Sequence, residues 1–406
     1  MMKEDTKEWT VLIYANGNND LEPETWQAML AAEASCHTNI NVIYEIGRVD
    51  TTLVKMFRPG LVLSRDCNEW TGVRRYLLTG GKSVLLNDFG SRNMANPHCL
   101  FEFIKAGIDG FPAEHYMVIL GGHGYQFVGS MPDYSQELPY IMGFPEMADA
   151  LDSASVQTGR KIDLLVADIC YFNFIEVVYE FAKRAEHGVK NILTYICDGP
   201  ICGMPYAQII DHLQNKPSNS VSDLIKGLTE KLNLDLVAFA LDYNKLEAIK
   251  QNFNELAAVY GNTKPQSRLS LNEILFTRDP DLPWYRLASQ ALQNLEEMVI
   301  AYKRISDNDY GLINIANTPT ANAKLDSLYT RLSFTKNNAW TGLLIEQSSE
   351  HDASKNADIP APIALTPEEV FAYISIMNPE LGQDERICII KNLIEYKNWM
   401  YPDTST

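Results

Sequence analysis

The first half of the chain alternates short apolar runs with longer stretches in which apolar residues recur at helical spacing. The apolar runs predict β-strands at residues 9–15, 41–47, 115–121, 161–168 and 190–197. The stretches between them predict helices at about 20–36, 97–108, 144–158 and 171–186. Apolar strands that alternate with helices are typical of a mostly parallel sheet covered on both faces. Two further extended runs within 51–65, separated by Pro59-Gly60, predict a hairpin.

The pattern changes after about residue 205, where amphipathic helices predominate. Helical spacing predicts helices over residues 245–261, 284–305 and 367–377. The apolar run "AWTGLLIEQ" (339–347) predicts one late strand, and the polar, proline-rich stretch 351–369 predicts a loop or linker. We therefore predict an α/β fold in two parts. An α/β core spans residues 1–205, and a mainly helical C-terminal region, 206–406, packs on it.

Composition and charge narrow the class of protein. The 406 residues are 46% hydrophobic and 21% charged, which is typical of a globular protein. Asp and Glu number 52 against 34 Lys and Arg, a net charge of -18 that argues against nucleic acid or an anionic membrane as the main partner and favours a cationic substrate. No apolar run has the length of a signal peptide or membrane span. The sequence predicts a cytoplasmic monomer, or a secreted protein if a longer precursor exists.

The cysteines are odd in number and scattered, which predicts reduced thiols rather than a disulfide framework. They stand at positions 36, 67, 99, 170, 197, 202 and 388. Five histidines (37, 98, 115, 212 and 351) show no metal-ligand spacing with these cysteines or with one another, so we predict no metal site. The GxSxG signature of an α/β hydrolase is also absent from the sequence.

Two of the predicted strands end in reactive residues. The run 115–121 leads into Gly122-His123-Gly124, and 161–168 leads into Ile169-Cys170. Carboxyl ends of parallel strands meet at one edge of a sheet, so His123 and Cys170 are candidates for an acyl-transfer pair in which the histidine protonates the leaving group. A helix after Cys170 would favour its thiolate. The separation, 170 − 123 = 47 residues, is close to the roughly 50 of caspases.

Glycine at position 124 allows the backbone to approach a substrate closely. Its N–H and that of Cys170 are candidate oxyanion donors. The alternative for Cys170 is an inert core residue, since cysteines are often buried. The polar run Asn16-Gly17-Asn18-Asn19-Asp20 predicts a turn and helix N-cap, with a substrate contact as a further hypothesis.

Four segments, in this order, resemble the clostripain-like cysteine peptidases, of the same clan as caspases, gingipains and legumain. They are "WTVLIYANGNNDLE", "RNMANPHCLFEFIKAGIDGFPAEHYMVILGGHG", "DLLVADICYFNFIEVVYEF" and "CDGPICGMPY". The resemblance implies a caspase-like sheet, with His123 and Cys170 as the catalytic pair and Gly124 as the oxyanion glycine. It implies no cofactor. Calcium stabilises some relatives, but no EF-hand-like loop places it here.

The resemblance also implies cleavage of peptides or proteins after Arg or Lys, which requires a carboxylate in the primary pocket. Asp168, two residues before Cys170, would point to the same side as the nucleophile in a strand. Asp198 is a second candidate, although an aspartate at the end of a strand often only closes a turn.

Several residues differ from the family's usual pattern and predict a bulkier or more closed pocket wall. They are Gly122, Tyr125, Phe127, Tyr171, Phe172 and Cys197. These differences leave open a second hypothesis, a peptidase-like binding or regulatory protein with little turnover.

Relatives often mature by cutting themselves at a basic residue between the histidine and the cysteine. The segment "YQFVGSMPDYSQELPYIMG" (125–143) contains no Lys or Arg. We therefore predict a single uncut chain.

Overall fold

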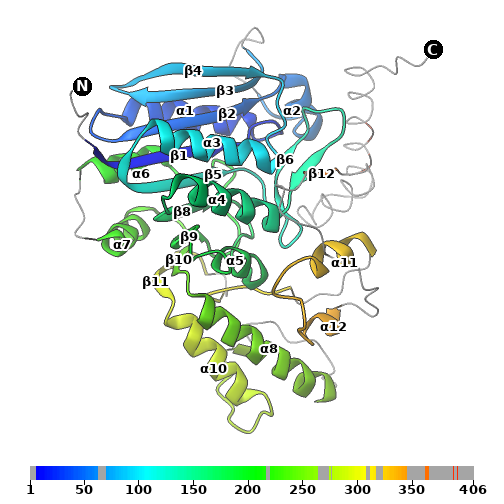
Figure 1. Ribbon diagram of the computed structural model, residues 1–406. Helices are drawn as coiled ribbons and strands as arrows, with labels where there is room; N and C mark the ends of the chain where they lie inside the picture. The colour runs from blue at the N-terminus through cyan, green and yellow to red at the C-terminus, as the bar shows by residue number, and fades with distance from the viewer. Residues whose placement is uncertain are drawn as a thin grey trace.

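A nine-stranded sheet forms the centre of the protein (Figure 1). The computed structural model describes residues 6–62, 70–215, 220–263, 274–275, 277–307, 311–316, 323–344, 362–364, 387 and 391. Across the sheet the strand order is β11 (Val299–Lys303), β10 (Leu236–Ala240), β9 (Asn191–Tyr195), β8 (Leu164–Asp168), β5 (Ala113–Gly121), β1 (Lys7–Ala15), β2 (Asn41–Arg48), β3 (Gly72–Thr79) and β4 (Lys82–Gly90). The five strands from β9 to β2 are parallel to one another. At one end β10 and β11, and at the other end β3 and β4, are added by antiparallel pairing.

Helices cover both faces of the sheet, which explains why its central strands are apolar along their length. On β1, Leu12 and Tyr14 belong to one core layer, and Val11 and Ile13 belong to the other. The first layer lies under α3 (Pro97–Gly110), α4 (Phe144–Thr158) and α5 (Ile175–Ala182). The second lies under α1 (Glu22–Ser35), α6 (Tyr206–Asn215) and α7 (Val221–Lys231). The predicted α/β fold is therefore confirmed.

All five strands predicted in the first half are present, as β1, β2, β5, β8 and β9, and the four predicted helices are α1, α3, α4 and α5. The predicted hairpin within 51–65 is wrong. Residues Thr51–Phe57 form α2, because the Asp50 carboxylate caps it by accepting a hydrogen bond from the Thr52 N–H at 2.6 Å. The hairpin lies later, between β3 and β4. It turns at Gly80-Gly81, whose φ angles of 57° and 70° favour glycine.

The second half of the chain also adds strands to the sheet. The predicted helix 245–261 lies within α8 (Tyr243–Thr263). The predicted helix 284–305 is correct only as far as α10 (Tyr285–Glu296), because the residues that follow pair with β10 as strand β11. The division of the chain at residue 205 stays a prediction.

The predicted late strand at 339–347 is wrong within the described residues. Thr341–Leu344 forms the short helix α12, and Trp340, just before it, is the buried residue of the apolar run. Trp340 packs against Phe253 of α8, and its indole N–H donates to the Ala316 carbonyl at 3.1 Å. The predicted helix 367–377 lies outside the described residues.

A second, small sheet consists of β12 (Ile363–Ala364), β7 (Tyr140–Met142) and β6 (Ser130–Asp133). The strand β12 falls in the predicted loop 351–369, of which only residues 362–364 are described. Along the chain, α11 (Ala323–Thr330) and α12 precede β12.

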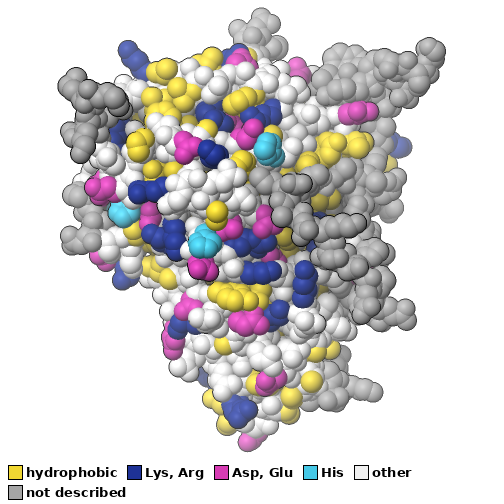
Figure 2. All heavy atoms as spheres, in the orientation of Figure 1, with side chains coloured by type: hydrophobic (Ala, Val, Ile, Leu, Met, Phe, Trp, Pro, Cys, Tyr) yellow, Lys and Arg dark blue, Asp and Glu magenta, His cyan; other side chains and the backbone are white. Residues whose placement is uncertain are grey.

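Acidic and basic side chains are interspersed over the face of the molecule shown in Figure 2, without a continuous basic field. Among the helices of the described chain, none combines the length and the apolar character that a membrane crossing requires.

Candidate active site

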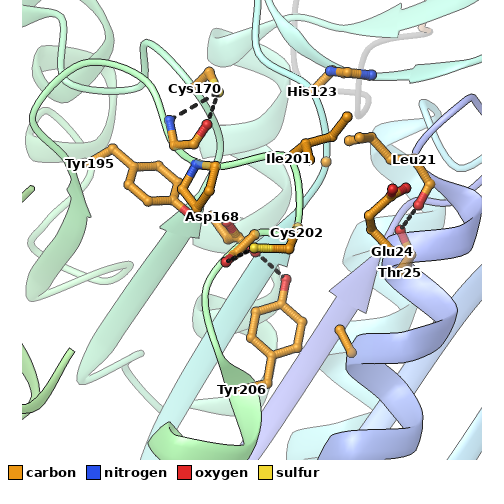
Figure 3. Close-up of a pocket in the computed structure, with 16 residues that line it drawn as sticks. Leu21, Glu24, Thr25, His123, Asp168, Cys170, Tyr195, Ile201, Cys202 and Tyr206 are labelled. Atoms are coloured by element: carbon orange, nitrogen blue, oxygen red, sulfur yellow. Dashed lines mark hydrogen bonds between the residues drawn. The ribbon is translucent and has the colours of Figure 1, made fainter. Parts of the chain in front are cut away.

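Two neighbouring strands bring the candidate residues to one edge of the sheet. β5 and β8 are parallel, and Gly121 lies opposite Asp168 in their register. The Gly122 N–H donates to the Asp168 carbonyl at 3.2 Å and ties the two strand ends together. His123 and Cys170, each two residues beyond this pair, line one pocket of about 190 Å³. Figure 3 shows them on opposite sides of the top of the pocket.

Cys170 is a partly buried thiol held by the backbone of Gly199. Its Sγ accepts a hydrogen bond from the Gly199 N–H at 3.3 Å. Burial raises the pKa of the Cys170 thiol to about 11, and the charges of Asp168 and Asp198 act in the same direction. The prediction that a helix N-terminus stabilises the Cys170 thiolate is wrong, because α5 begins only at Ile175. The resting residue is therefore a thiol at neutral pH.

The turn that carries Cys170 is fixed from the neighbouring strand and from the second half of the chain. Tyr171 has a φ of 57°, and its N–H donates to the Cys197 carbonyl at 2.6 Å. The side-chain amides of Asn173 and Asn314 both donate to the Ile196 carbonyl, at 2.9 and 2.8 Å. The nucleophile's loop is thus held to the end of β9.

Gly124 packs directly against the backbone of Cys170. A Cβ atom at this position would lie 2.0 Å from the Cys170 carbonyl oxygen, so a larger residue cannot occupy it without a shift. Gly124 stands opposite Ser130 in an isolated antiparallel bridge. The two hydrogen bonds of this bridge are made by the residues on either side of the pair and not by Gly124 and Ser130 themselves. In such a pair the residue's own N–H points away from the opposite strand. The Gly124 N–H is therefore directed away from Ser130.

His123 makes a hydrogen bond that the sequence analysis did not predict. Its Nε2 lies 3.0 Å from Oδ1 of Asp20, which follows strand β1. The side chains of His123 and Asp20 are 26% and 15% exposed. Burial acts to raise the pKa of Asp20, but the charge and hydrogen bond of His123, with the charge of Arg58, outweigh it and lower that pKa. Among the described residues, no hydrogen bond joins His123 to Cys170.

Buried amides build the loop that carries Asp20. Asn16 and Asn19 donate their side-chain N–H groups to the Pro132 carbonyl at 3.0 and 2.9 Å, and Asn18 donates to the Asp133 carboxylate at 2.7 Å. All three asparagines are at most 1% exposed. The run predicted to be a polar turn is therefore an internal part of the fold.

A buried carboxylate, Asp168, lies on the inner side of the pocket. Its two oxygens accept hydrogen bonds from the hydroxyls of Tyr195 and Tyr206, at 2.6 and 2.7 Å (Figure 3). Burial raises the pKa of Asp168, and the two hydroxyl hydrogen bonds partly oppose this rise. The structure does not bring Asp198 into this group. Its side chain is exposed and does not line the pocket.

The expected bulkier pocket wall is not found at the residues that depart from the family pattern. Phe172 packs in the core between Phe144 and Phe181, and Phe127 packs edge-on against Tyr329. Neither lines the pocket. The outer wall comes instead from the turn after β9, where Ile201 is 57% exposed and Cys202 is also exposed. In the described parts of the chain, no three His, Cys, Asp or Glu side chains gather as metal ligands.

Comparison with known proteins identifies the family. The sequence profile of the clostripain family matches residues 79–344, more than half of the chain. A comparison with curated proteins finds no significant match.

Solved structures share the fold at low sequence identity. An inactive zymogen of a C11 protease from Parabacteroides distasonis is 18% identical, with a TM-score of 0.58 over 82% of this chain and 98% of that one. A secreted C11 cysteine protease from Bacteroides thetaiotaomicron is 15% identical, with a TM-score of 0.54 over 82% and 99% of the two chains. Such a protease from the same organism, in complex with an irreversible peptide inhibitor, is also 15% identical, with a TM-score of 0.55 over 81% and 98%. The chain therefore belongs to the clostripain family, a family of cysteine peptidases with a caspase-like α/β fold.

Proposed function

We propose that this cysteine peptidase is an endopeptidase that cleaves after Arg or Lys through Cys170, His123 and an acyl-enzyme intermediate. The observation that supports the proposal is the gathering of a thiol, an imidazole and a buried carboxylate, Asp168, around one pocket at the carboxyl edge of the sheet.

The reaction follows from these groups. The Cys170 thiol gives its proton to His123 as its sulfur bonds to the scissile carbonyl carbon, and the N–H groups of Gly124 and Cys170 stabilise the oxyanion. His123 then returns the proton to the leaving amine as the C–N bond breaks. A water molecule, deprotonated by His123, attacks the thioester and releases the acid product and the Cys170 thiol.

The preference for a basic residue follows from the charge inside the pocket. Asp168 is buried and accepts hydrogen bonds from two neutral hydroxyls, so an arginine or lysine side chain that reaches it would favour its ionised form and pair with it shielded from water. Glu24, the other carboxylate that lines the pocket, is already paired with Arg58 at 2.8 Å. We propose Asp198 as a secondary, exposed contribution to the attraction of cationic substrates.

The proposal also includes the substrate class, the oligomeric state and the location of the enzyme. A peptide or protein is the substrate, in keeping with the peptide inhibitor bound to one of the similar proteases. We propose that the enzyme acts as a monomer in the cytoplasm, uncut and without a cofactor. An intact mass after prolonged incubation tests the uncut chain, and two fragments divided within residues 125–145 would contradict it.

A second function, binding of peptides with little turnover, is favoured by the raised pKa of Cys170 and by the lack of a described Cys170–His123 hydrogen bond. Hydrolysis of short fluorogenic peptides ending in Arg or Lys distinguishes peptidase activity from peptide binding. The peptidase function predicts that the protein hydrolyses these peptides and that Cys170→Ala does not. Binding of these peptides without release of the fluorophore, and no labelling of Cys170 by a basic acyloxymethyl ketone, would favour the second.

A further inference from the structure

We infer that Asp20 is a positioning residue for His123: it holds Nε2 of the ring and so directs Nδ1 to the pocket as the nitrogen that exchanges protons with Cys170. The catalytic consequence of this inference rests on the proposed function. The geometry itself is independent of that function.

The orientation of the ring follows from its contacts. A neutral imidazole carries one proton, and the partner of one nitrogen decides which nitrogen holds it. A carboxylate is only an acceptor, so the Asp20 contact at 3.0 Å places the proton on Nε2. Nδ1 then has its lone pair free to accept a proton. The ring of Tyr125 lies beside that of His123, with ring centroids 6.2 Å apart and an interplanar angle of 29°.

Asp20 is itself fixed before any substrate arrives. The buried amides of Asn16, Asn18 and Asn19 hold the preceding loop. On the other side, Arg58 donates to the Asp20 carbonyl at 3.0 Å while it pairs with Glu24. A residue whose backbone is held on both sides can keep the imidazole in a single orientation without reorganisation during the reaction.

The charge of Asp20 also acts in the required direction. The lowered pKa of Asp20 keeps it ionised at neutral pH. When His123 accepts the Cys170 proton, the imidazolium forms next to this carboxylate. The other groups that interact with Asp20 are Arg58, whose charge lowers the same pKa, and the Tyr134 hydroxyl, whose pKa is raised by burial and by the Asp20 charge.

Kinetics of three variants test the inference. Asp20→Asn keeps the size of the side chain and removes its charge. We expect kcat to fall at least about 10-fold, but less than the 10²- to 10⁴-fold typical of removing a general acid or base, as in His123→Ala, with KM nearly unchanged. Asp20→Glu restores part of kcat.

The matched control, Asp50→Asn, keeps the cap of α2 and leaves kcat unchanged. A kcat for Asp20→Asn equal to that of the wild type would overturn the inference.

A spectroscopic measurement separates this inference from the proposed function. In Cys170→Ala protein with ¹⁵N-labelled histidine, the ring shifts of His123 report which nitrogen carries the proton. We expect protonated Nε2 with Asp20 present and a shift towards protonated Nδ1 in Asp20→Asn, whose amide can donate to Nε2. Identical ring shifts in the two proteins would refute the role of Asp20. If the wild type hydrolyses no basic peptide, the proposed function fails while this measurement still decides the inference.

Discussion

The buried carboxylate of Glu176 accepts a hydrogen bond from the hydroxyl of Tyr329 at 2.9 Å. The pair joins α5, which follows the nucleophile, to α11 in the second half of the chain. The same carboxylate oxygen accepts the Ala316 N–H at 3.0 Å. Burial raises the pKa of Glu176 to about 7.

This carboxyl group makes the stability of the protein depend on pH. Between its ordinary value of 4.5 and about 7, folded Glu176 keeps a proton that the unfolded chain releases. The free energy of unfolding therefore falls as the pH rises through this window, by up to about 3 kcal/mol. Glu176→Gln keeps an acceptor for both hydrogen bonds but cannot ionise. We expect the variant to gain stability relative to the wild type between about pH 5 and about pH 8.

Urea unfolding at the two pH values measures this change, with the exposed Glu137→Gln as control. If the difference in unfolding free energy between Glu176→Gln and the wild type is the same at both, Glu176 does not titrate in this range.

Asn314 should support the catalytic loop from a distance. Asn314→Ala removes one of the two amides on the Ile196 carbonyl, beside the loop that holds Cys170. We expect a loss of about 1–2 kcal/mol in stability, the cost of a partly buried hydrogen bond, and a lower kcat. Thermal unfolding and peptide hydrolysis measure these effects. Asn294→Ala, which removes an exposed amide on α10, is the matched control and should change neither.

Asp168 and Asp198 should differ in their effect on specificity. Asp168→Asn removes a buried charge, so we expect transition-state binding of arginine peptides to weaken by about 2–5 kcal/mol. This corresponds to a fall in kcat/KM of at least about 30-fold. Asp198 is exposed, and its replacement by Asn should cost less than about fivefold. Peptides with citrulline in place of arginine measure the contribution of the charge. An unchanged preference for arginine in Asp168→Asn would show that another residue binds the cation.

Gly124 should tolerate no side chain. In Gly124→Ala, the new methyl group would meet the Cys170 carbonyl and displace the backbone that holds the candidate oxyanion donors. We expect kcat to fall by about 10²- to 10³-fold, the effect of losing an oxyanion donor. Gly110→Ala at the end of α3 places its Cβ in open space and serves as control. Thermal unfolding of both variants shows whether the loss reflects the site or the fold. A well-folded Gly124→Ala with normal kcat would remove Gly124 from the oxyanion site.

The central sheet was predictable because its parallel strands are covered on both faces and are therefore apolar along their length. The strand ends then indicated His123 and Cys170 without knowledge of any contact. β11 was not predictable in this way. Its short sequence continues the apolar spacing of α10, and only pairing with β10 makes it a strand. The helix α2 was missed although Asp50 gave an N-cap signal before it.

The electrostatics of the site depend on contacts between distant residues. Asp20 and His123 are 103 positions apart, and polar residues after a strand are equally typical of a simple turn. The resting state of Cys170 was mispredicted because its loop contains four residues before α5, too many for the helix N-terminus to act directly. Such effects follow from loop geometry, which local spacing does not reveal.

The attachment of α5 to the second half of the chain has a consequence for biosynthesis. Glu180 of α5 accepts hydrogen bonds from the backbone N–H and the hydroxyl of Ser333. A ribosome makes the protein from its amino end, so the nucleophile emerges more than a hundred residues before the chain that braces it. A nascent polypeptide therefore lacks a finished catalytic edge while its neighbours on the polysome are still unfolded and most vulnerable to cleavage.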